Sequence, residues 1–433
     1  MANAALDPHA AIATTASGVG QGLLTTADGK PLARALVRSQ RRARRRAFLL
    51  VLPLLAFVVI TFVVPIGQML QRSFYNDGFS ANMPQVSAWF AATERGTDPN
   101  DAAWAALAQD LVASADARSI GVVGTRVNYD MPGTRSLFTA TGRQVRGGLE
   151  PPYREALLEI NETWGDPRLW SVMREASTPV TANFYLAAVD RTRDDEGRVQ
   201  QVAEQQRIYV TLFWRTFWLS AVITALTFVL GFPIAHLLAT LPMRQSNLLM
   251  ILVLLPFWTS LLVRTTSWMV LLQQQGVIND ILVWMGVIGG GQRLQMIYNQ
   301  TGTIIAMTHI LLPFMILPLY SVMRTINPSY VRAARSLGAT SWTAFRRVYF
   351  PQTLPGLGAG AMLVFILAVG YYITPALVGG SSGQLISNMI ASHMTGTLNW
   401  SMAAALAALL LGAVLVLYWL YDRLVGVDNL KLG

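Results

Sequence analysis

Side chains able to do covalent or phosphoryl chemistry are few in this sequence, and their spacing matches no catalytic set. The chain has no cysteine, four histidines and two lysines, Lys30 and Lys431. A loop that cradles nucleotide phosphates needs the pattern Gly-x-x-x-x-Gly-Lys-Ser/Thr, and neither lysine lies in one. The histidines are scattered, and no HExxH or Ser–His–Asp arrangement is evident. We therefore predict no catalytic residue, no bound metal or cofactor and no ATP hydrolysis by this chain.

The most distinctive polar stretch, residues 324–356, lies between two apolar stretches. It contains five arginines and no carboxylate, and its arginines are Arg324, Arg332, Arg335, Arg346 and Arg347. Two interpretations are open. The stretch is either a basic loop that only fixes the orientation of the chain in a membrane, or an element shaped to dock into a groove of a partner.

The first half of this stretch predicts a short helix. Pro328 is favourable at a helix start, because its missing N–H would be unpaired there anyway. Val331, Ala334 and Leu337 recur at a spacing that puts them on one face. Gly338 is expected to end the helix, since glycine takes the left-handed conformation at low cost.

The second half predicts another helix, from Trp342 to Phe350. Thr340 or Ser341 can cap its start, and Pro351 is expected to stop it. One side of this helix would carry three aromatic residues, Trp342, Phe345 and Tyr349. The whole stretch therefore reads as a helix–glycine–helix element with exposed aromatic and basic side chains.

The composition predicts an integral membrane protein. The 433 residues are 53% hydrophobic and only 13% charged. The net charge of +10 would suit a nucleic-acid partner, but its distribution argues against one. Residues 72–207 hold 18 acidic and 14 basic residues, so the positive excess lies beside the apolar segments, where it sets membrane orientation.

Residues 1–46 are predicted to be a basic cytoplasmic tail without regular structure. Five arginines between residues 41 and 46 precede an apolar run from Ala47 to Leu70, which exceeds the ~20 residues needed to cross a bilayer. A twin-arginine export signal is the alternative, but this run is too long for one and no small-x-small cleavage site follows. We expect a first transmembrane helix over residues 47–71, with its N-terminus inside.

Residues 72–207 are predicted to form a polar insertion on the extracytoplasmic side, because the first helix is expected to start inside. Helical patterns occur at Asp101–Ala113, Pro152–Ile160 and Pro167–Ala176. The candidates for a small core are Trp89, Trp104, Trp164, Trp170, Phe184 and Tyr185. The role of the insertion is open between a docking surface or cap over a pathway and a purely structural insertion.

Five further apolar spans are predicted within residues 208–433. They are roughly Thr211–Leu238, Leu248–Leu272, Thr303–Met323, Leu357–Val378 and Met402–Val425. Outside the insertion, basic residues concentrate in the N-terminal tail, residues 241–247, the loop 324–356 and the C-terminus, which predicts both termini in the cytoplasm. The expected fold is an all-α membrane protein, a bundle of six transmembrane helices with a polar insertion after the first.

Polar and helix-breaking residues in the spans mark a candidate translocation path. They are Trp258, Thr259, Ser260, Arg264, Tyr371, Tyr372, Thr374, Pro375 and Asn388. Each is also compatible with ordinary helix packing or an interfacial position. A charge such as Arg264 usually faces the interior, a water-filled cavity or an interface. Breaks or kinks are further expected at Pro233, Pro256, Pro313, Pro318 and Gly370.

Several of these stretches resemble the permease subunits of ABC importers, in particular those for spermidine, putrescine and related solutes. The "EAA" loop of that family is matched by Ala333-Ala334, Gly338, Phe345, Val348, Pro351 and Pro355-Gly356. Further matches lie at residues 231–235, 255–264, 276–279, 312–320, 372–380 and 399–400, so the resemblance covers about half of the chain. This chain has Arg332 where the family usually has glutamate.

The resemblance implies that the loop 324–356 couples the permease to separate ATPase subunits. The implied coupling residues are Arg332, Ala333, Ala334, Leu337, Gly338, Ala339, Trp342, Phe345, Val348 and Pro351. It further implies import by alternating access in the bacterial cytoplasmic (inner) membrane, with a second permease (a copy or a paralogue) and an extracytoplasmic solute-binding protein. The solute stays open among polyamine-like, opine and amino-acid-derived compounds.

Two other classes compete with this interpretation. A secondary transporter driven by an ion gradient normally needs carboxylates or histidines in the membrane as relay groups, and the spans contain only His236 and His309 and essentially no acid. A membrane-bound enzyme would need a polar catalytic arrangement, which is not evident. Both are therefore less favoured than an importer permease.

Overall fold

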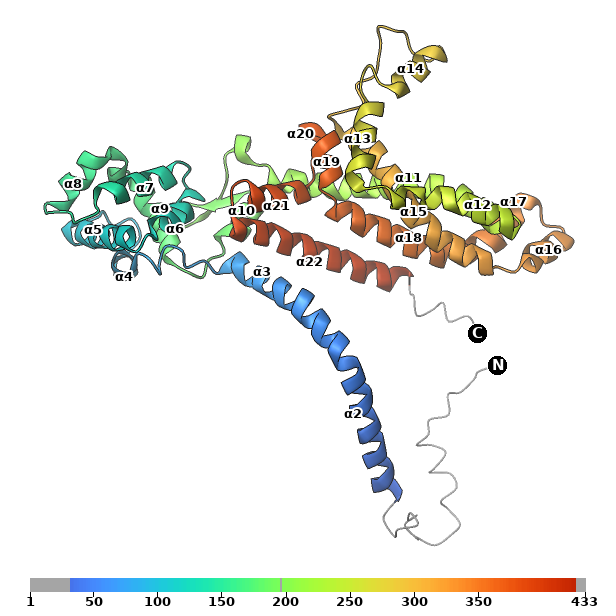
Figure 1. Ribbon diagram of the computed structural model, residues 1–433, viewed down its shortest axis with the longest axis horizontal. Coiled ribbons are helices and arrows are strands. Elements are labelled where there is room, and N and C mark those ends of the chain that lie inside the picture. The colour runs from blue at the N-terminus through green and yellow to red at the C-terminus, as the bar shows by residue number, and fades with distance from the viewer. Residues whose placement is uncertain (1–31, 195–196, 426–433) are drawn as a thin grey trace. The chain divides into compact units, whose positions relative to one another are not determined.

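The computed structural model describes residues 32–194 and 197–425, and these are mostly helical (Figure 1). The chain divides into two compact units, Met1–Gln68 and Met69–Gly433. Strand β1 (Arg191–Arg193) pairs with β2 (Val199–Gln201) in an antiparallel ladder, the one sheet within the described ranges.

The described part of the first unit is a long helix. Helix α2 (Leu32–Val58) continues through the π-helical segment η1 (Val59–Val63) into α3 (Val64–Phe74), which extends into the second unit. The stretch Ala43–Phe74 is long and apolar enough to cross a membrane. The helix begins earlier than the predicted start at residue 47, because residues 32–46 are rich in Ala, Leu, Arg and Gln, which favour helix. The earlier part of the predicted tail, residues 1–31, lies outside the described residues.

The polar segment after this helix folds into a bundle of short helices. They are α4 (Pro84–Ala92), α5 (Asp101–Asp116), α6 (Ile120–Asn128), α7 (Thr134–Gln144), α8 (Tyr153–Ile160), α9 (Pro167–Ser177) and α10 (Asn183–Ala188), with the 3-10 turns η2 (Glu162–Gly165) and η3 (Glu204–Gln206). The three predicted helices are confirmed as α5, α8 and α9. Side-chain caps start two of them: Asn100 accepts from the Ala103 amide, and Asp166 from the Arg168 amide.

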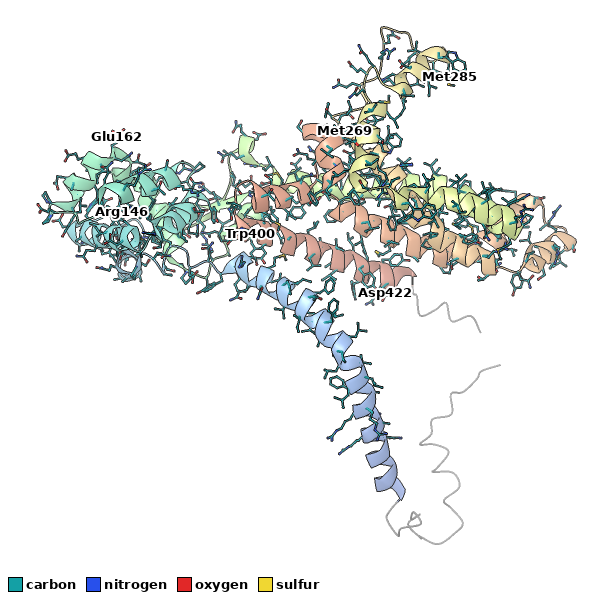
Figure 2. All side chains as sticks on the ribbon, in the orientation of Figure 1. Arg146, Glu162, Met269, Met285, Trp400 and Asp422 are labelled. Atoms are coloured by element: carbon teal, nitrogen blue, oxygen red, sulfur yellow. The ribbon has the colours of Figure 1, made fainter. Side chains whose placement is uncertain are left out.

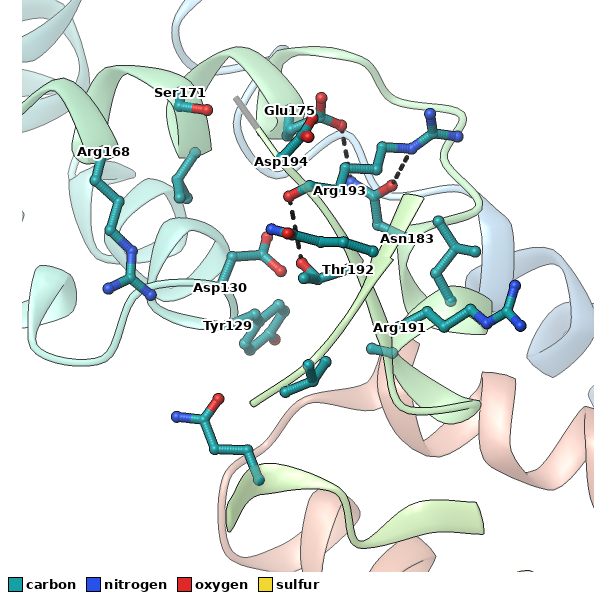
Figure 3. Close-up of a pocket in the computed structure, with 16 residues that line it drawn as sticks. Tyr129, Asp130, Arg168, Ser171, Glu175, Asn183, Arg191, Thr192, Arg193 and Asp194 are labelled. Carbon is teal, nitrogen blue, oxygen red and sulfur yellow. Dashed lines mark hydrogen bonds between the residues drawn. The ribbon is translucent and has the colours of Figure 1, made fainter. Parts of the chain in front are cut away.

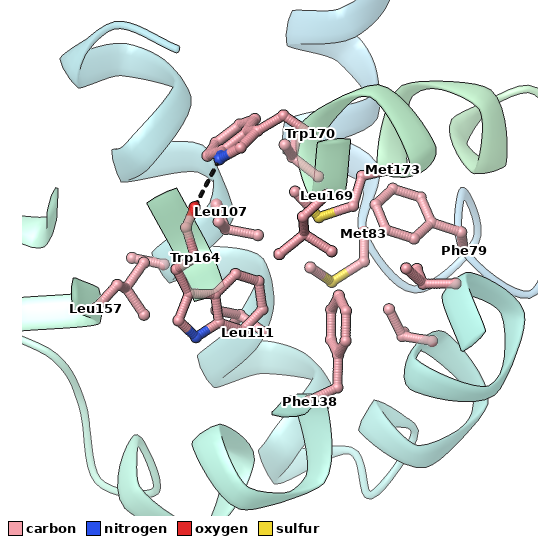
Figure 4. Packing of buried hydrophobic residues seen from close by; sticks show 14 of the residues in the cluster. Phe79, Met83, Leu107, Leu111, Phe138, Leu157, Trp164, Leu169, Trp170 and Met173 are labelled. Carbon is pink, nitrogen blue, oxygen red and sulfur yellow. Dashed lines mark hydrogen bonds between the residues drawn. The ribbon is translucent and has the colours of Figure 1, made fainter. Parts of the chain in front are cut away.

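The predicted aromatic core of this segment is confirmed for its tryptophans. Trp104, Trp164 and Trp170 are buried within one cluster, and Trp89 packs against it. Figure 4 shows Trp164 and Trp170 in this cluster. The indole N–H of Trp170 donates to the Trp164 carbonyl oxygen at 2.8 Å. The prediction is wrong for Phe184 and Tyr185, which belong to a second cluster shared with the last helix of the chain.

Three long helices form the centre of the apolar part of the chain: α11 (Tyr209–Thr240), α15 (Gln300–Thr325) and α18 (Phe350–Gly370). Small residues let α18 approach α15 closely. A Cβ atom at Gly356 would lie 2.8 Å from the Pro318 carbonyl oxygen. Helix α22 (Trp400–Val425) supplies a further apolar stretch. Figure 2 shows the side chains on all these elements.

Five helices among the described residues are long and apolar enough to span a membrane, or six if one bent pair counts as a span. That pair corresponds to the predicted span 248–272. Helix α12 (Met243–Leu254) and the turn η4 (Leu255–Trp258) meet α13 (Leu261–Leu271) at a bend of 97°. Helix α14 (Val277–Trp284) follows and extends away from the central helices (Figure 1).

The predicted span 357–378 also differs. Helix α18 ends at Gly370, and three short helices follow before α22: α19 (Ile373–Val378), α20 (Gly380–Gly383) and α21 (Ile386–Thr395). The expected breaks at Pro233, Pro313 and Pro318 do not occur, since these prolines lie inside the continuous helices α11 and α15.

Candidate functional site

Helix α16 (Pro328–Ser336) forms the first half of the arginine-rich loop. Asn327 caps its start, with its side-chain oxygen accepting a hydrogen bond from the Ser329 amide at 2.9 Å. Pro328 occupies the first turn, as predicted. Arg324 attaches the loop to the end of α11, because its Nη1 donates to the Ala239 carbonyl oxygen at 2.8 Å.

Gly338 ends this helix in a Schellman motif. The Gly338 amide donates to the Arg335 carbonyl oxygen at 3.0 Å, and the Ala339 amide donates to the Ala334 carbonyl oxygen at 3.1 Å. Gly338 has a φ of +89°, in the region that glycine adopts most easily. The prediction that Gly338 separates two helices is therefore confirmed.

The second helix of the loop does not stop at Pro351. Its first turn, α17 (Ser341–Ala344), is capped by the Thr340 hydroxyl, which accepts from the Thr343 amide at 3.2 Å. The π-helical segment η5 (Phe345–Tyr349) then leads without a gap into α18. Proline clashes with the carbonyl four residues back in an α-helix. We attribute its tolerance here to the change of hydrogen-bond register in the π segment.

An aromatic row runs from the loop into the bundle. The rings of Trp342 and Phe345 stack at 5.7 Å, and those of Phe345 and Tyr349 at 5.9 Å. Helix α11 meets this row at two points. Phe232 lies edge-on to Phe345 at 6.0 Å, and His236 Nδ1 lies 3.0 Å from the Tyr349 hydroxyl. The row thus joins the loop to α11 by direct side-chain contact.

The outer surface of the loop is apolar and basic. Leu337 is 90% exposed and Trp342 is 68% exposed. The predicted common face with Val331 and Ala334 is therefore wrong for Leu337, because the first two are half-buried toward the bundle. Four of the arginines are exposed and form no ion pair with any described carboxylate: Arg332, Arg335, Arg346 and Arg347.

The remaining residues predicted for coupling divide between the two sides of the loop. Ala333, Gly338 and Pro351 are exposed, whereas Ala339, Phe345 and Val348 are half-buried. The structure thus brings the predicted set together on one element, but only part of it faces outward.

The first group of predicted pathway residues lies at the 97° bend. The side chain of Trp258 is 73% exposed at the end of η4. Thr259 donates from its hydroxyl to the Pro256 carbonyl oxygen at 2.9 Å. Ser260 caps α13, because its hydroxyl accepts from the Val263 amide at 3.2 Å. Two of these three side chains therefore hold the bend.

The second group lies at the break between α18 and α19. Tyr371 and Tyr372 separate these helices, and their carbonyl oxygens are bonded by side chains from α21. Ser387 donates to the Tyr371 oxygen at 2.6 Å, and Asn388 Nδ2 donates to the Tyr372 oxygen at 2.7 Å. Ser387 was missed by the sequence reasoning. The adjacent pair Ser387-Asn388 at a helix start was the available signal.

The bent pair and the broken helix touch each other. Thr374 is fully buried in α19, and its hydroxyl lies 3.1 Å from that of Thr265 on α13. Pro375 is buried beside it. Most of the predicted pathway set is therefore gathered where two irregular helices meet, an arrangement that membrane proteins tolerate only within protein or along a cavity.

Arg264 lies on α13 in this region. Its side chain is half-buried, and its Nε atom is buried without a hydrogen-bond partner. No carboxylate in the described residues pairs with it. Between Tyr209 and Val425 the sequence has two acids, Asp280 and Asp422, and Asp280 pairs with Arg293 at 2.8 Å. The region around Arg264 therefore carries positive charge without a protein counter-ion.

A further cavity, which sequence reasoning did not find, lies in the polar segment. It has a volume of about 500 Å³ and is lined by side chains of both charges, among them Asp130, Glu175, Arg168 and Arg191 (Figure 3). Asn183 bridges part of its wall, because it donates to Glu175 at 2.8 Å and accepts from Arg193 at 3.1 Å. None of the residues predicted from the sequence lines this cavity.

The chain is similar to known transport proteins over its second half. The family described as "Binding-protein-dependent transport system inner membrane component" matches residues 208–426. The spermidine/putrescine transport system permease protein PotB of Escherichia coli strain K12 is 33% identical over 243 residues, which cover 54% of this chain and 88% of that protein. The inner membrane ABC transporter permease protein YdcU of the same strain is 32% identical over 203 residues, which cover 44% of this chain and 64% of that protein.

Among solved structures, a bacterial ABC transporter for the acidic polysaccharide alginate is similar with a TM-score of 0.42 and 18% identity, over 53% of this chain and 81% of that chain. The family match covers half of the chain, and all the apolar helices described above except Ala43–Phe74 lie within it. The chain therefore belongs to the family of binding-protein-dependent inner membrane transport components, as a permease subunit of an ABC importer.

Proposed function

We propose that this permease imports a small organic solute by alternating access, and that the loop 324–356 is the surface on which the ATPase docks. One observation carries the proposal. The loop exposes Leu337 and Trp342 among arginines that have no described acidic partner. Exposed apolar side chains of this size within a charged rim are typical of a protein interface.

The contacts of the loop suggest how docking could move the bundle. The aromatic row from Trp342 through Phe345 reaches α11, and η5 continues directly into α18. A displacement of the docked loop would therefore reach two of the central helices without an intervening flexible linker. ATP binding shifts the bundle only if the ATPase binds this loop with different affinity in its two states.

The same proposal includes six membrane spans, with both termini in the cytoplasm and residues 72–207 on the outer side. The arginine distribution supports this orientation. The partners would be ATPase subunits, a second permease that is a copy or a paralogue, and a solute-binding protein that meets the extracytoplasmic segment. The name of the matching family, which refers to a binding protein, supports the last of these.

For the solute, we favour a compound that carries a carboxylate, such as an opine or an amino-acid derivative. The relatives named for spermidine and putrescine support a small amine, but a polyamine would need acids or aromatic faces in the path. Arg264 lacks a protein counter-ion where the irregular helices meet. A carboxylate on the solute would supply one.

The central experiment is uptake by the complex in vesicles. The tagged chain, expressed with its own partner genes, should copurify with an ATPase and accumulate solute only when ATP is supplied on the ATPase side. Uptake without ATP but with an ion gradient would contradict the proposal and favour a secondary transporter.

The choice of solute is tested with Arg264→Gln and Arg264→Lys. We expect carboxylate-bearing solutes to compete for uptake in the natural protein, and Gln to weaken that competition about tenfold, as the loss of a charge-assisted hydrogen bond predicts. Lysine should restore part of it. If spermidine competes for uptake, carboxylate-bearing solutes do not, and neither variant changes this, the carboxylate proposal is contradicted and the importer proposal remains intact.

A further inference from the structure

A second cavity lies in the polar segment, and two of its lining residues, Asn76 and Tyr129, form hydrogen bonds to residues near the start of the last apolar helix. We call it the seam cavity. It has a volume of about 380 Å³, and its polar lining includes Asn76, Arg118, Thr125, Arg126, Tyr129 and Arg135. Three arginines and no carboxylate line it, so its charge is one-sided.

Arg126 is the buried member of this group. Its side chain is 2% exposed, and its guanidinium packs over the Phe184 ring at 5.2 Å. One of its nitrogens, Nη1, binds Asp130 at 2.7 Å, whereas Nε and Nη2 have no hydrogen-bond partner. A buried guanidinium with two unused donors is costly unless another group accepts from it.

The other two arginines add charge at the rim. Arg118 and Arg135 are exposed, and neither forms an ion pair with a described acid. Burial raises the pKa of Tyr129, and the positive charges of Arg126 and Arg135 oppose that shift. Both guanidinium groups therefore act on the same part of the cavity.

The seam cavity lies beside the ends of two candidate membrane spans. Asn76 follows the stretch Ala43–Phe74 by two residues, and its Nδ2 donates to the Ser401 hydroxyl at 2.9 Å. The Tyr129 hydroxyl donates to the carbonyl oxygen of Leu398 at 3.0 Å, just before the span Trp400–Arg423. Two residues that line the cavity therefore contact or follow the ends of candidate spans, where a headgroup would be within reach.

We propose that the seam cavity binds a phosphate group, and that the phosphate of an anionic lipid headgroup supplies it. Guanidinium groups match phosphate oxygens in geometry and charge, and arginines at a membrane surface attract anionic lipids. The phosphate would lie in the cavity that Arg118, Arg126 and Arg135 line. This site is separate from the ATPase docking surface and from the solute path.

The test uses the full complex, purified in a detergent and then supplied with phosphatidylglycerol, phosphatidylcholine or inorganic phosphate. Binding is read by native mass spectrometry and by the shift of the thermal unfolding midpoint. The test variant is Arg118→Gln with Arg135→Gln, since both side chains are exposed and the fold should survive. The matched control is Arg143→Gln with Arg146→Gln, two exposed arginines of the same segment that do not line the cavity.

We expect phosphatidylglycerol to bind the natural complex and the control, and to bind the test variant roughly 30-fold more weakly, from the loss of two surface arginines. If inorganic phosphate binds and phosphatidylglycerol does not, and the test variant binds phosphate more weakly than the control does, the cavity is a phosphate site whose ligand is free phosphate. That result would overturn the lipid as its source. Equal binding by all three proteins, or equal weakening in test and control variants, would overturn the proposal.

Discussion

At the scale of single residues, Gly338 is the position where backbone conformation matters most for the docking surface. Its φ of +89° suits glycine, and a Cβ atom there would meet nothing within 4 Å. A substitution therefore acts through backbone strain alone, of about 1–2 kcal/mol. We expect Gly338→Val to reduce the amount of ATPase that copurifies with the chain several-fold.

Gly338→Asn is the matched control, since asparagine tolerates the left-handed conformation. It should retain most of the ATPase. Membrane insertion, measured as the yield of the purified chain, should be the same for both variants. Equal copurification by the two variants would show that the turn at Gly338 is not needed for docking.

Asp110 is a second residue whose environment gives a prediction. Its carboxylate is buried and accepts a hydrogen bond from the Val86 amide at 2.8 Å, at the start of α4. Burial raises the pKa of Asp110 to about 6, because its effect exceeds that of the backbone hydrogen bonds, which lower the pKa. The folded state therefore binds this proton more tightly than the unfolded state. The resulting stabilisation is complete below about pH 4 and is lost as the pH rises through 6.

We expect the protection of the Val86 amide against hydrogen exchange to fall between pH 4 and 7, by up to about 3 kcal/mol. Asp110→Asn keeps an acceptor for the amide but cannot titrate, so its protection should be nearly flat over this range. The same slope in Asp110→Asn would assign the effect to another group.

At the scale of elements, the contact between α13 and α19 includes one buried pair of hydroxyl groups. The hydroxyls of Thr265 and Thr266 each donate a hydrogen bond to a carbonyl oxygen of their own helix. Only the Thr265 hydroxyl also lies within hydrogen-bond distance of the Thr374 hydroxyl. Thr265→Val should destabilise the complex by about 1 kcal/mol, because the buried Thr374 hydroxyl loses its neighbour. Thr266→Val should stay within about 0.5 kcal/mol.

The measurement is the thermal unfolding midpoint of the complex in detergent, together with uptake. If the meeting of α13 and α19 forms part of the path, Thr265→Val should also slow uptake while Thr266→Val does not. Equal midpoints and equal uptake in both variants would contradict a joint role for these two helices.

The elements also show how far the sequence could be interpreted. Local signals were sufficient for α16, where Pro328 and Gly338 mark the two ends. The break at Tyr371 and Tyr372 was signalled only by the preceding Gly370, which ends α18. It is held by hydrogen bonds from Ser387 and Asn388, which lie 16 residues further along the chain. Contacts at that separation cannot be deduced from spacing alone.

Pro351 gives the opposite lesson. A proline normally ends or kinks a helix, so the sequence predicted a stop. The π-helical segment before it changes the local register, and the helix continues to Gly370. Likewise, the exposure of Leu337 depends on the tight Schellman turn that follows α16. Helical periodicity alone placed it on one face with Val331 and Ala334, which are half-buried.

At the scale of the whole molecule, apolar length predicted the membrane class. It also predicted six spans, whereas five described helices qualify, or six if the bent pair counts as one. The family match covers residues 208–426, so it does not account for the polar segment. Both the cavity lined by Asp130, Glu175, Arg168 and Arg191 and the seam cavity lie in the polar segment. Neither could be predicted, because their lining residues come from separate helices and loops that meet only in the folded chain.

The absence of cysteine in the sequence allows single cysteines to report on the docking surface. Leu337 on the loop and Trp284 on α14 are matched in exposure, at 90% and 87%. Leu337→Cys and Trp284→Cys would each be labelled in the full complex with a short reagent that carries a maleimide for the cysteine and a photoreactive diazirine for any neighbouring group, with and without ATP.

The central claim is that the ATPase docks on the arginine-rich loop. It predicts a crosslink from Leu337→Cys to the ATPase, with a yield that changes when ATP binds, and no such crosslink from Trp284→Cys. No crosslink at Leu337→Cys, or an equal yield at both positions, would contradict it.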